Sequence, residues 1–182
     1  MWDGQAQPNQ QASIYADRSL AAHHQGQVQQ ALELAQRALS LAEVSDDARA
    51  LAQAHNMLGM LASHHSDTQA ALHHLEQSLI LAEKLHDPAM RAAALNNLAQ
   101  AYRSNGATER ALSLTESALA VNASQGDRHR EAALHNNLAD LLHALGQTEA
   151  AMAHLKQAVS IYAEIGVEAG AVQPEIWKLS EW

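Results

Sequence analysis

Residues 95–99 read Leu-Asn-Asn-Leu-Ala, and forty positions later residues 135–139 read His-Asn-Asn-Leu-Ala. The same phase extends to both sides of these segments. A leucine followed by a small residue recurs every 40 positions, as Leu58-Gly59, Leu98-Ala99 and Leu138-Ala139. Further columns hold the phase, namely Ala71, Ala111 and Ala151, then Leu79, Leu119 and Val159, and the boundary residues Asp47, Asp87 and Asp127. Because so many columns agree, the sequence predicts a chain of repeated structural units.

Each unit has the apolar spacing of two helices. In the second unit one stripe consists of Leu51, Ala54, Leu58, Leu61 and Ala62, which is a helical period. Ser66 interrupts the pattern, and Asp67 stands where an N-cap of the next helix belongs. Gly106 and Gly146 take the place of Ser66 in later units, and glycine readily ends a helix. The unit is therefore helix, tight turn, helix, tight turn, with helices of about 17 residues.

The composition agrees with an all-α protein. Of the 182 residues 47% are apolar, with no Phe, abundant Ala and Leu, three Pro and eight Gly. The expected organisation is a flexible tail over residues 1–12, repeats over 13–46, 47–86, 87–126 and 127–166, and a linker and capping helix over 167–182. The first repeat is degenerate, because Arg18 stands at the key Leu position. In the last segment, Pro174 is expected to begin the capping helix, and Trp177 and Trp182 either cap the stack or form a dimer contact.

These columns resemble the tetratricopeptide repeat family. The Leu-Gly of its first helix corresponds to Leu58-Gly59, and the small residues of its second helix correspond to Ala71 and Ser78-Leu79. The 40-residue period, longer than the familiar unit, and the two Asn-Asn-Leu-Ala segments are similar to the longer-helix subtype of kinesin light chains and bacterial signalling proteins. The resemblance implies a right-handed α-solenoid whose first helices line a concave groove. The implied peptide-binding positions are Asn56, Met60, His64, Asn96, Asn97, Gln100, Arg103, Asn136, Asn137, Asp140 and His143, with Ser63, and less clearly His23 and His24, beside them.

The asparagines are the most informative of these residues. Asn56, Asn96 and Asn136 recur every 40 residues inside predicted helices, although asparagine has a mediocre helix propensity. A carboxamide both donates and accepts hydrogen bonds, so a row of them could hold the backbone of an extended ligand. The alternative is that one Asn of each pair bonds a neighbouring helix, and both roles can coexist. In the same way Arg103 either binds a ligand carboxylate or pairs with Asp140.

Twelve histidines are the other unusual feature, with doublets at 23–24, 64–65 and 73–74. His24 and His64 share a column and are expected to be neighbours. Adjacent residues on a helix point about 100° apart, and no His-x-x-x-His pair occurs, so no metal site is predicted. Solvated histidines with a mild pH response are the expected outcome.

Several function classes are disfavoured. A net charge of −9 without a basic cluster argues against nucleic acid, and Cys is absent. No apolar stretch approaches about 20 residues, and the polar start resembles no secretory signal, so a cytoplasmic location without membrane contact is expected. No phosphate-binding loop, nucleophile elbow or dinucleotide turn is present, so neither catalysis nor a cofactor is expected.

The sequence thus predicts a scaffold that binds a protein or peptide in its groove. The alternatives are a self-assembling homodimer module or a regulatory segment of a larger signalling protein. A histidine-based binder of a metal or small ligand is a third class.

Overall fold

The structure, a computed structural model, describes residues 8–166, and these form only α-helices joined by short turns. The helices are α1 (Pro8–His24), α2 (Val28–Ser45), α3 (Ala48–His64), α4 (Thr68–Lys84), α5 (Pro88–Ser104), α6 (Thr108–Ala123), α7 (Arg128–Ala144) and α8 (Thr148–Glu164). The prediction of an all-α chain of four helical hairpins is confirmed. The capping helix predicted after Pro174 lies outside the described residues.

The N-terminus of a helix is marked by aspartate in four places. The Asp47 carboxylate accepts from the backbone N–H groups of Arg49 and Ala50, and Asp67 accepts from Ala70. Asp87 and Asp127 do the same for α5 and α7. Each carboxylate satisfies donors that have no partner inside the helix, so the boundary column has a capping role.

A turn follows every 20 residues, and each turn contains one residue in the left-handed region. Five of these residues are glycines, and the other three are Asp46, Ser66 and His86, with φ of 49°, 61° and 51°. After most of them the next backbone N–H reaches back to the helix, as Asp67 N does to Ala62 O at 3.0 Å. All three residues with side chains border or divide the second repeat.

Replacing Ser66 with glycine is expected to raise the free energy of unfolding by about 1 kcal/mol. A side chain in the left-handed region costs about 1–2 kcal/mol, and the extra freedom of glycine in the unfolded chain offsets part of the gain. Ser66 is exposed, so no packing is lost. The matched control is Gly106→Ser at the same position of the next repeat, which should lose a similar amount in urea denaturation. Changes of the same sign in both variants would contradict the turn argument.

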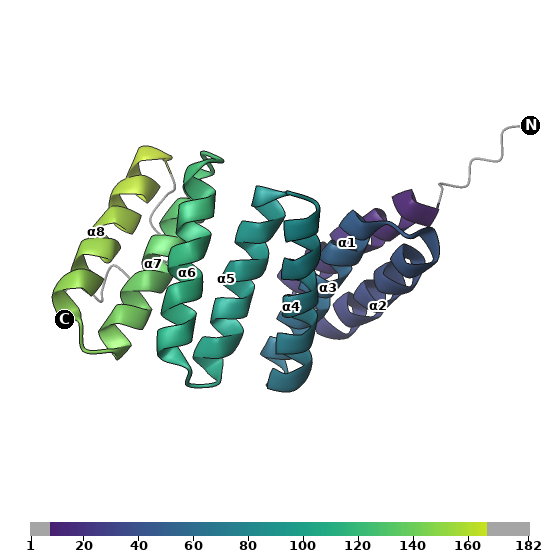
Figure 1. Cartoon of the computed structure of the whole chain (residues 1–182), viewed down its shortest axis with the longest axis horizontal. Helices are drawn as coiled ribbons and strands as arrows, with labels where there is room; N and C mark the ends of the chain where they lie inside the picture. Colours follow the sequence, from purple (N-terminus) through teal and green to yellow (C-terminus); the bar gives the residue numbers. More distant parts are fainter. Residues whose placement is uncertain (1–7, 167–182) are drawn as a thin grey trace, which may run out of the picture.

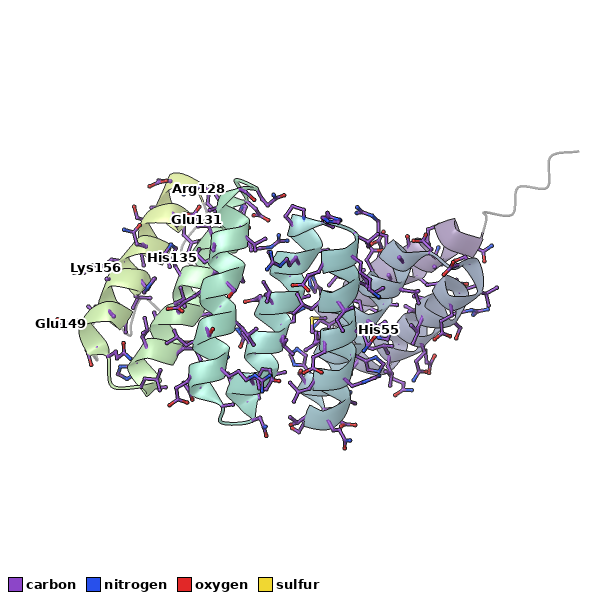
Figure 2. The ribbon with its side chains drawn as sticks, in the orientation of Figure 1. His55, Arg128, Glu131, His135, Glu149 and Lys156 are labelled. Atoms are coloured by element: carbon purple, nitrogen blue, oxygen red, sulfur yellow. The ribbon has the colours of Figure 1, made fainter. Side chains whose placement is uncertain are left out.

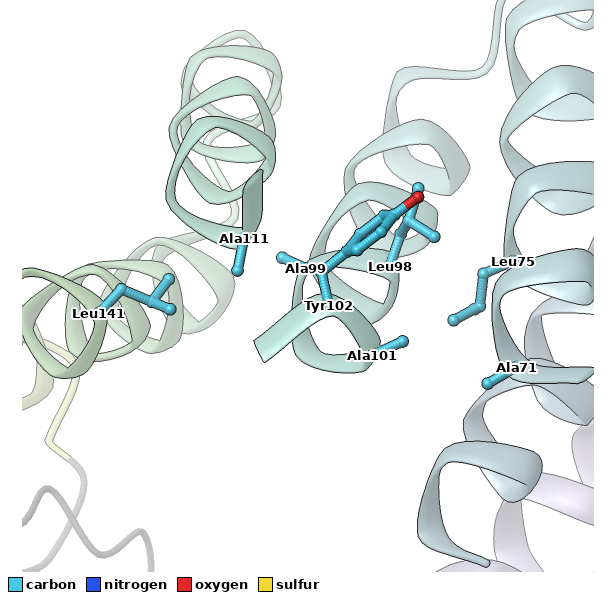
Figure 3. Close-up of a cluster of buried hydrophobic side chains, with 8 residues drawn as sticks. All are labelled: Ala71, Leu75, Leu98, Ala99, Ala101, Tyr102, Ala111 and Leu141. Atoms are coloured by element: carbon cyan, nitrogen blue, oxygen red, sulfur yellow. The ribbon is translucent and has the colours of Figure 1, made fainter. Parts of the chain in front are cut away.

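The hairpins α1–α2, α3–α4, α5–α6 and α7–α8 stand side by side along the long axis of the molecule (Figure 1). We call α1, α3, α5 and α7 the first helices and the others the second helices. The core runs between hairpins, and one cluster joins repeats two, three and four through residues that include Leu75, Leu98, Tyr102 and Leu141 (Figure 3). Stacking of neighbours therefore completes a core that no single hairpin has.

The small columns allow close approach inside a hairpin. A Cβ atom placed on Gly59 would lie 2.5 Å from Leu75 Cγ and 3.1 Å from Ala71 O. The first repeat has Ser19 in this column, fully buried, with its Oγ donating to Ala31 O at 2.7 Å. Its neighbour Arg18 is exposed, so the degenerate repeat turns its arginine away from the core.

The start of the first repeat differs from the prediction. Helix α1 begins at Pro8, inside the segment predicted as a tail over residues 1–12. Proline is compatible with the first turn of a helix, because the N–H it lacks would have no partner there.

None of the helices in the described part of the chain is long and apolar enough to cross a membrane.

Candidate functional site

The predicted groove positions lie on α3, α5 and α7, where two asparagine hydrogen bonds join consecutive first helices. Asn97 Nδ2 donates to Asn56 Oδ1 at 3.0 Å, and Asn137 Nδ2 donates to Asn96 Oδ1 at 2.9 Å. Both bonds span 41 residues, one more than the repeat. The structure thus shows the helix-joining role that the sequence left as an alternative.

These bonds leave part of each carboxamide available. A carboxamide has two N–H donors and an oxygen with two lone pairs. Each of the bonds uses one N–H of its donor residue and one lone pair of its acceptor. The asparagine row can therefore join the helices and still contact a ligand, while Asn136 occupies the last position of the row on α7.

Arg103 and Asp140 form an ion pair between α5 and α7. Arg103 Nη1 lies 3.3 Å from Asp140 Oδ2, and the side chains are 42% and 23% exposed. An ion pair this accessible to water is worth at most about 1 kcal/mol. Arg103 could therefore exchange this partner for a ligand carboxylate at small cost.

A cavity of about 320 Å³ lies between α3 and α5. Five predicted groove residues line it, together with two serines: Met60, His64, Asn97, Gln100 and Arg103, with Ser63 and Ser104. Met60 contributes apolar surface and the others contribute donors and acceptors. A mixed lining of this kind, beside a row of carboxamides, suits a side chain projecting from an extended ligand.

Three imidazoles on α1 and α3 lie close together at the N-terminal side of this cavity, with their rings tilted relative to one another. The rings of His23 and His64 lie 4.8 Å apart between centroids, and His24 lies beside His23 at 6.1 Å. The expected neighbour of His64 was His24, so this prediction is off by one residue. Burial lowers the pKa of His23, and His64 and His24 lower it further.

The remaining predicted position, His143, is exposed in the last turn of α7 and does not line the cavity. Within residues 8–166 no three His, Cys, Asp or Glu side chains come together in a way that could hold a metal ion.

A larger hollow of about 420 Å³ lies away from the groove, at the turn between α4 and α5. Its charged side chains are engaged in ion pairs. Arg91 Nε lies 3.4 Å from Glu83 Oε1, and Asp87 Oδ2 lies 2.7 Å from Arg49 Nη2. These contacts tie repeats two and three together, so we assign the hollow a structural role.

Two histidine pairs were not predicted. His55 faces His74 within the second repeat, and His135 faces His154 within the fourth. Burial is the main cause that lowers the pKa of all four, and for His55 it falls to about 4. The members of each pair are 19 residues apart and the pairs 80 apart, which is the signal that the sequence offered.

The chain is similar in structure to BtubC (BKLC) from P. vanneervenii, with a TM-score of 0.77 and 22% identity over 93% of this chain and 70% of that one. It is also similar to a Rap protein complexed with competence and sporulation factor, with a TM-score of 0.75 and 20% identity over 85% of this chain and 43% of that one. At these identities the likeness shows the fold alone.

A putative kinesin light chain of Podosopora anserina with nearly identical TPR-like repeats has a TM-score of 0.64 and 25% identity, covering 85% of this chain and 76% of that one. No curated protein matches the sequence. The model of the tetratricopeptide repeat matches twice, over residues 10–84 and 90–164, which is most of the chain. The chain belongs to the tetratricopeptide repeat family.

Proposed function

We propose that the chain is a scaffold that binds a protein or peptide along its first helices, without a catalytic step. The observation that carries the proposal is the cavity between α3 and α5, where five groove residues from two repeats meet. Repeats of this family generally mediate contacts between proteins. The structurally similar Rap protein, solved with competence and sporulation factor, supports the same kind of role for a fold of this shape.

In the proposed complex the asparagine row contacts the ligand backbone. Asn97 and Asn137 each keep an N–H and an oxygen outside the helix-joining bonds, and both are half-buried rather than enclosed. A peptide group offers one acceptor and one donor, which a carboxamide can match simultaneously. Such contacts favour an extended segment and depend little on its sequence.

Selectivity would come from the cavity and the ion pair. Met60 favours an apolar ligand group, and Gln100 adds hydrogen bonding. Arg103, held by Asp140 in a weak exposed pair, would bind an acidic ligand group, while Asp140 would bind a basic one. The arrangement therefore discriminates by side chain at the centre of the groove.

The test begins with affinity purification on the full chain and mass spectrometry of the captured proteins. A peptide from a captured partner is then titrated against the wild type and Gln100→Leu. We expect about tenfold weaker binding, because the variant loses hydrogen bonds in the cavity without touching an asparagine link. The readout is fluorescence anisotropy.

The matched control is Gln157→Leu, the same substitution at an exposed position of the second helix α8, which should bind like the wild type. Circular dichroism checks that both variants fold. If Gln100→Leu and the wild type bind every captured partner with equal affinity, the proposal that ligands bind in the groove is wrong.

A further inference from the structure

In each of two hairpins of the solenoid, a histidine on the first helix lies against a histidine on the second helix. His55 Nδ1 on α3 lies 2.9 Å from His74 Nδ1 on α4, and His135 Nδ1 on α7 lies 2.8 Å from His154 Nδ1 on α8. Ring centroids are 5.2 and 5.1 Å apart. Figure 2 marks His55 and His135, which lie in different repeats. The same geometry therefore occurs twice, in repeats two and four.

The other two repeats fill these positions without histidine. Repeat three has Leu95 and Leu114 there, packed together in one apolar cluster. Repeat one has Tyr15 and Leu34. Side chains other than histidine can therefore fill the space between the two helices at these positions. The imidazole pairs add a chemical property that leucine lacks.

That property is a limit on proton binding. In the neutral pair one Nδ1–H donates to the other Nδ1, and the distance leaves room for one hydrogen between them. A first added proton goes to Nε2 of the donor ring and keeps this bond. A second proton must bind the accepting Nδ1, where it would meet the other N–H directly. The folded pair therefore holds at most one added proton, whereas two unfolded histidines hold two.

We propose that the His55–His74 pair makes the second repeat acid-sensitive, so that the packing of α3 against α4 weakens progressively as the pH falls below the ordinary pKa of histidine, about 6.5. The unfolded chain then binds more protons than the folded one, and stability must fall with pH. This inference does not depend on the groove or on any ligand.

The charges around the two pairs differ. His74 and His73 lower the pKa of His55, and His73 lowers that of His74; no charged group in the described parts of α1, α2 or α5 is among the causes that shift either pKa. Glu131 and Arg128 on α7 act on His135, and Glu116 on α6 acts on His154. Glu131 raises the pKa of His135, against the opposing effect of Arg128, and Glu116 raises the pKa of His154, so carboxylates favour protonation of the fourth-repeat pair.

The sign of the effect follows from the direction of these shifts. Burial, then His74 and His73, lowers the pKa of His55 to about 4, below the ordinary value of 6.5. The contribution to stability is complete above pH 6.5 and is lost as the pH falls toward 4. Each proton that the folded state excludes raises the unfolding equilibrium constant by up to about tenfold per pH unit.

The experiment measures the unfolding of the full chain in urea between pH 7.5 and pH 4.5. The wild-type unfolding equilibrium constant increases by a certain factor for each pH unit by which the pH is lowered. In His55→Leu/His74→Leu, which copies the leucine pair of repeat three, this factor should be about tenfold smaller. The control His135→Leu/His154→Leu should change this slope less, because Glu131 and Glu116 already assist protonation. An unchanged slope in the His55–His74 variant would overturn the proposal.

Two further measurements decide the matter if that variant fails to fold. NMR titration of the wild-type imidazole protons should show His55 titrating well below pH 6, and ordinary titration of both His55 and His74 near 6.5 would overturn the proposal. The wild-type slope is also measured with a chelator. A slope that disappears would mean that the pair binds a metal ion rather than a proton, which would also overturn the proposal.

Discussion

Gly59→Val is expected to lower the free energy of unfolding by about 3 kcal/mol. The first added carbon would lie 2.5 Å from Leu75 Cγ, and Leu75 is completely buried. Overpacking of this kind costs about 1–3 kcal/mol, and a branched side chain belongs at the upper end. The better helix propensity of valine returns only about 0.4 kcal/mol. Urea denaturation at neutral pH measures the loss.

A double-mutant cycle isolates the contact. Leu75→Ala alone creates a cavity, but in the presence of Gly59→Val it also removes the obstruction. The loss of unfolding free energy in the double variant should therefore be smaller than the sum of the two single losses by about 1 kcal/mol or more. Strict additivity would mean that the backbone moves away instead, and that the small column is not needed for close approach.

Tyr102→Ala is expected to cost about 3 kcal/mol, because it empties the space between repeats two and three. Tyr102 is 7% exposed and belongs to the cluster in Figure 3. The guanidinium of Arg110 lies 4.4 Å from its ring centroid, and the hydroxyl is 3.4 Å from Glu76 Oε1. Most of the stabilisation therefore comes from the ring.

The matched control is Tyr102→Phe. It keeps the ring and the contact with Arg110 and loses only a long hydrogen bond, so a change within about 1 kcal/mol is expected. Thermal unfolding of the two variants beside the wild type gives the comparison. If phenylalanine costs as much as alanine, the hydroxyl and not the packing holds the repeats together.

The elements that repeat along the chain could be predicted from the sequence. The leucine and small-residue columns specified the hairpins, and Asp67 was correctly placed as a helix cap because capping is local. Ser66, Gly106 and Gly146 were correctly placed at turns for the same reason, and their positive φ values agree. Local chemistry and a steady period were sufficient for this part.

Contacts between helices were harder to predict. Consecutive first helices match with an offset of 41 rather than 40, as the asparagine bonds show, and this offset depends on how the hairpins tilt. It explains why His23, and not His24, lies against His64. To predict the His55–His74 contact, one must know how the two antiparallel helices of a hairpin align on either side of their turn. The columns of residues that recur every 40 positions do not give this alignment. Whether the groove residues bind a ligand stays a prediction.

The three left-handed turns without glycine have a consequence for partial unfolding. Asp46 and His86 border the second repeat and Ser66 divides it, and each carries backbone strain that the glycine turns avoid. In a stack where each unit contacts only its neighbours, the weakest unit determines where the stack separates. Limited proteolysis should then cut first inside residues 46–86, leaving the C-terminal half from α5 to α8 as a resistant fragment.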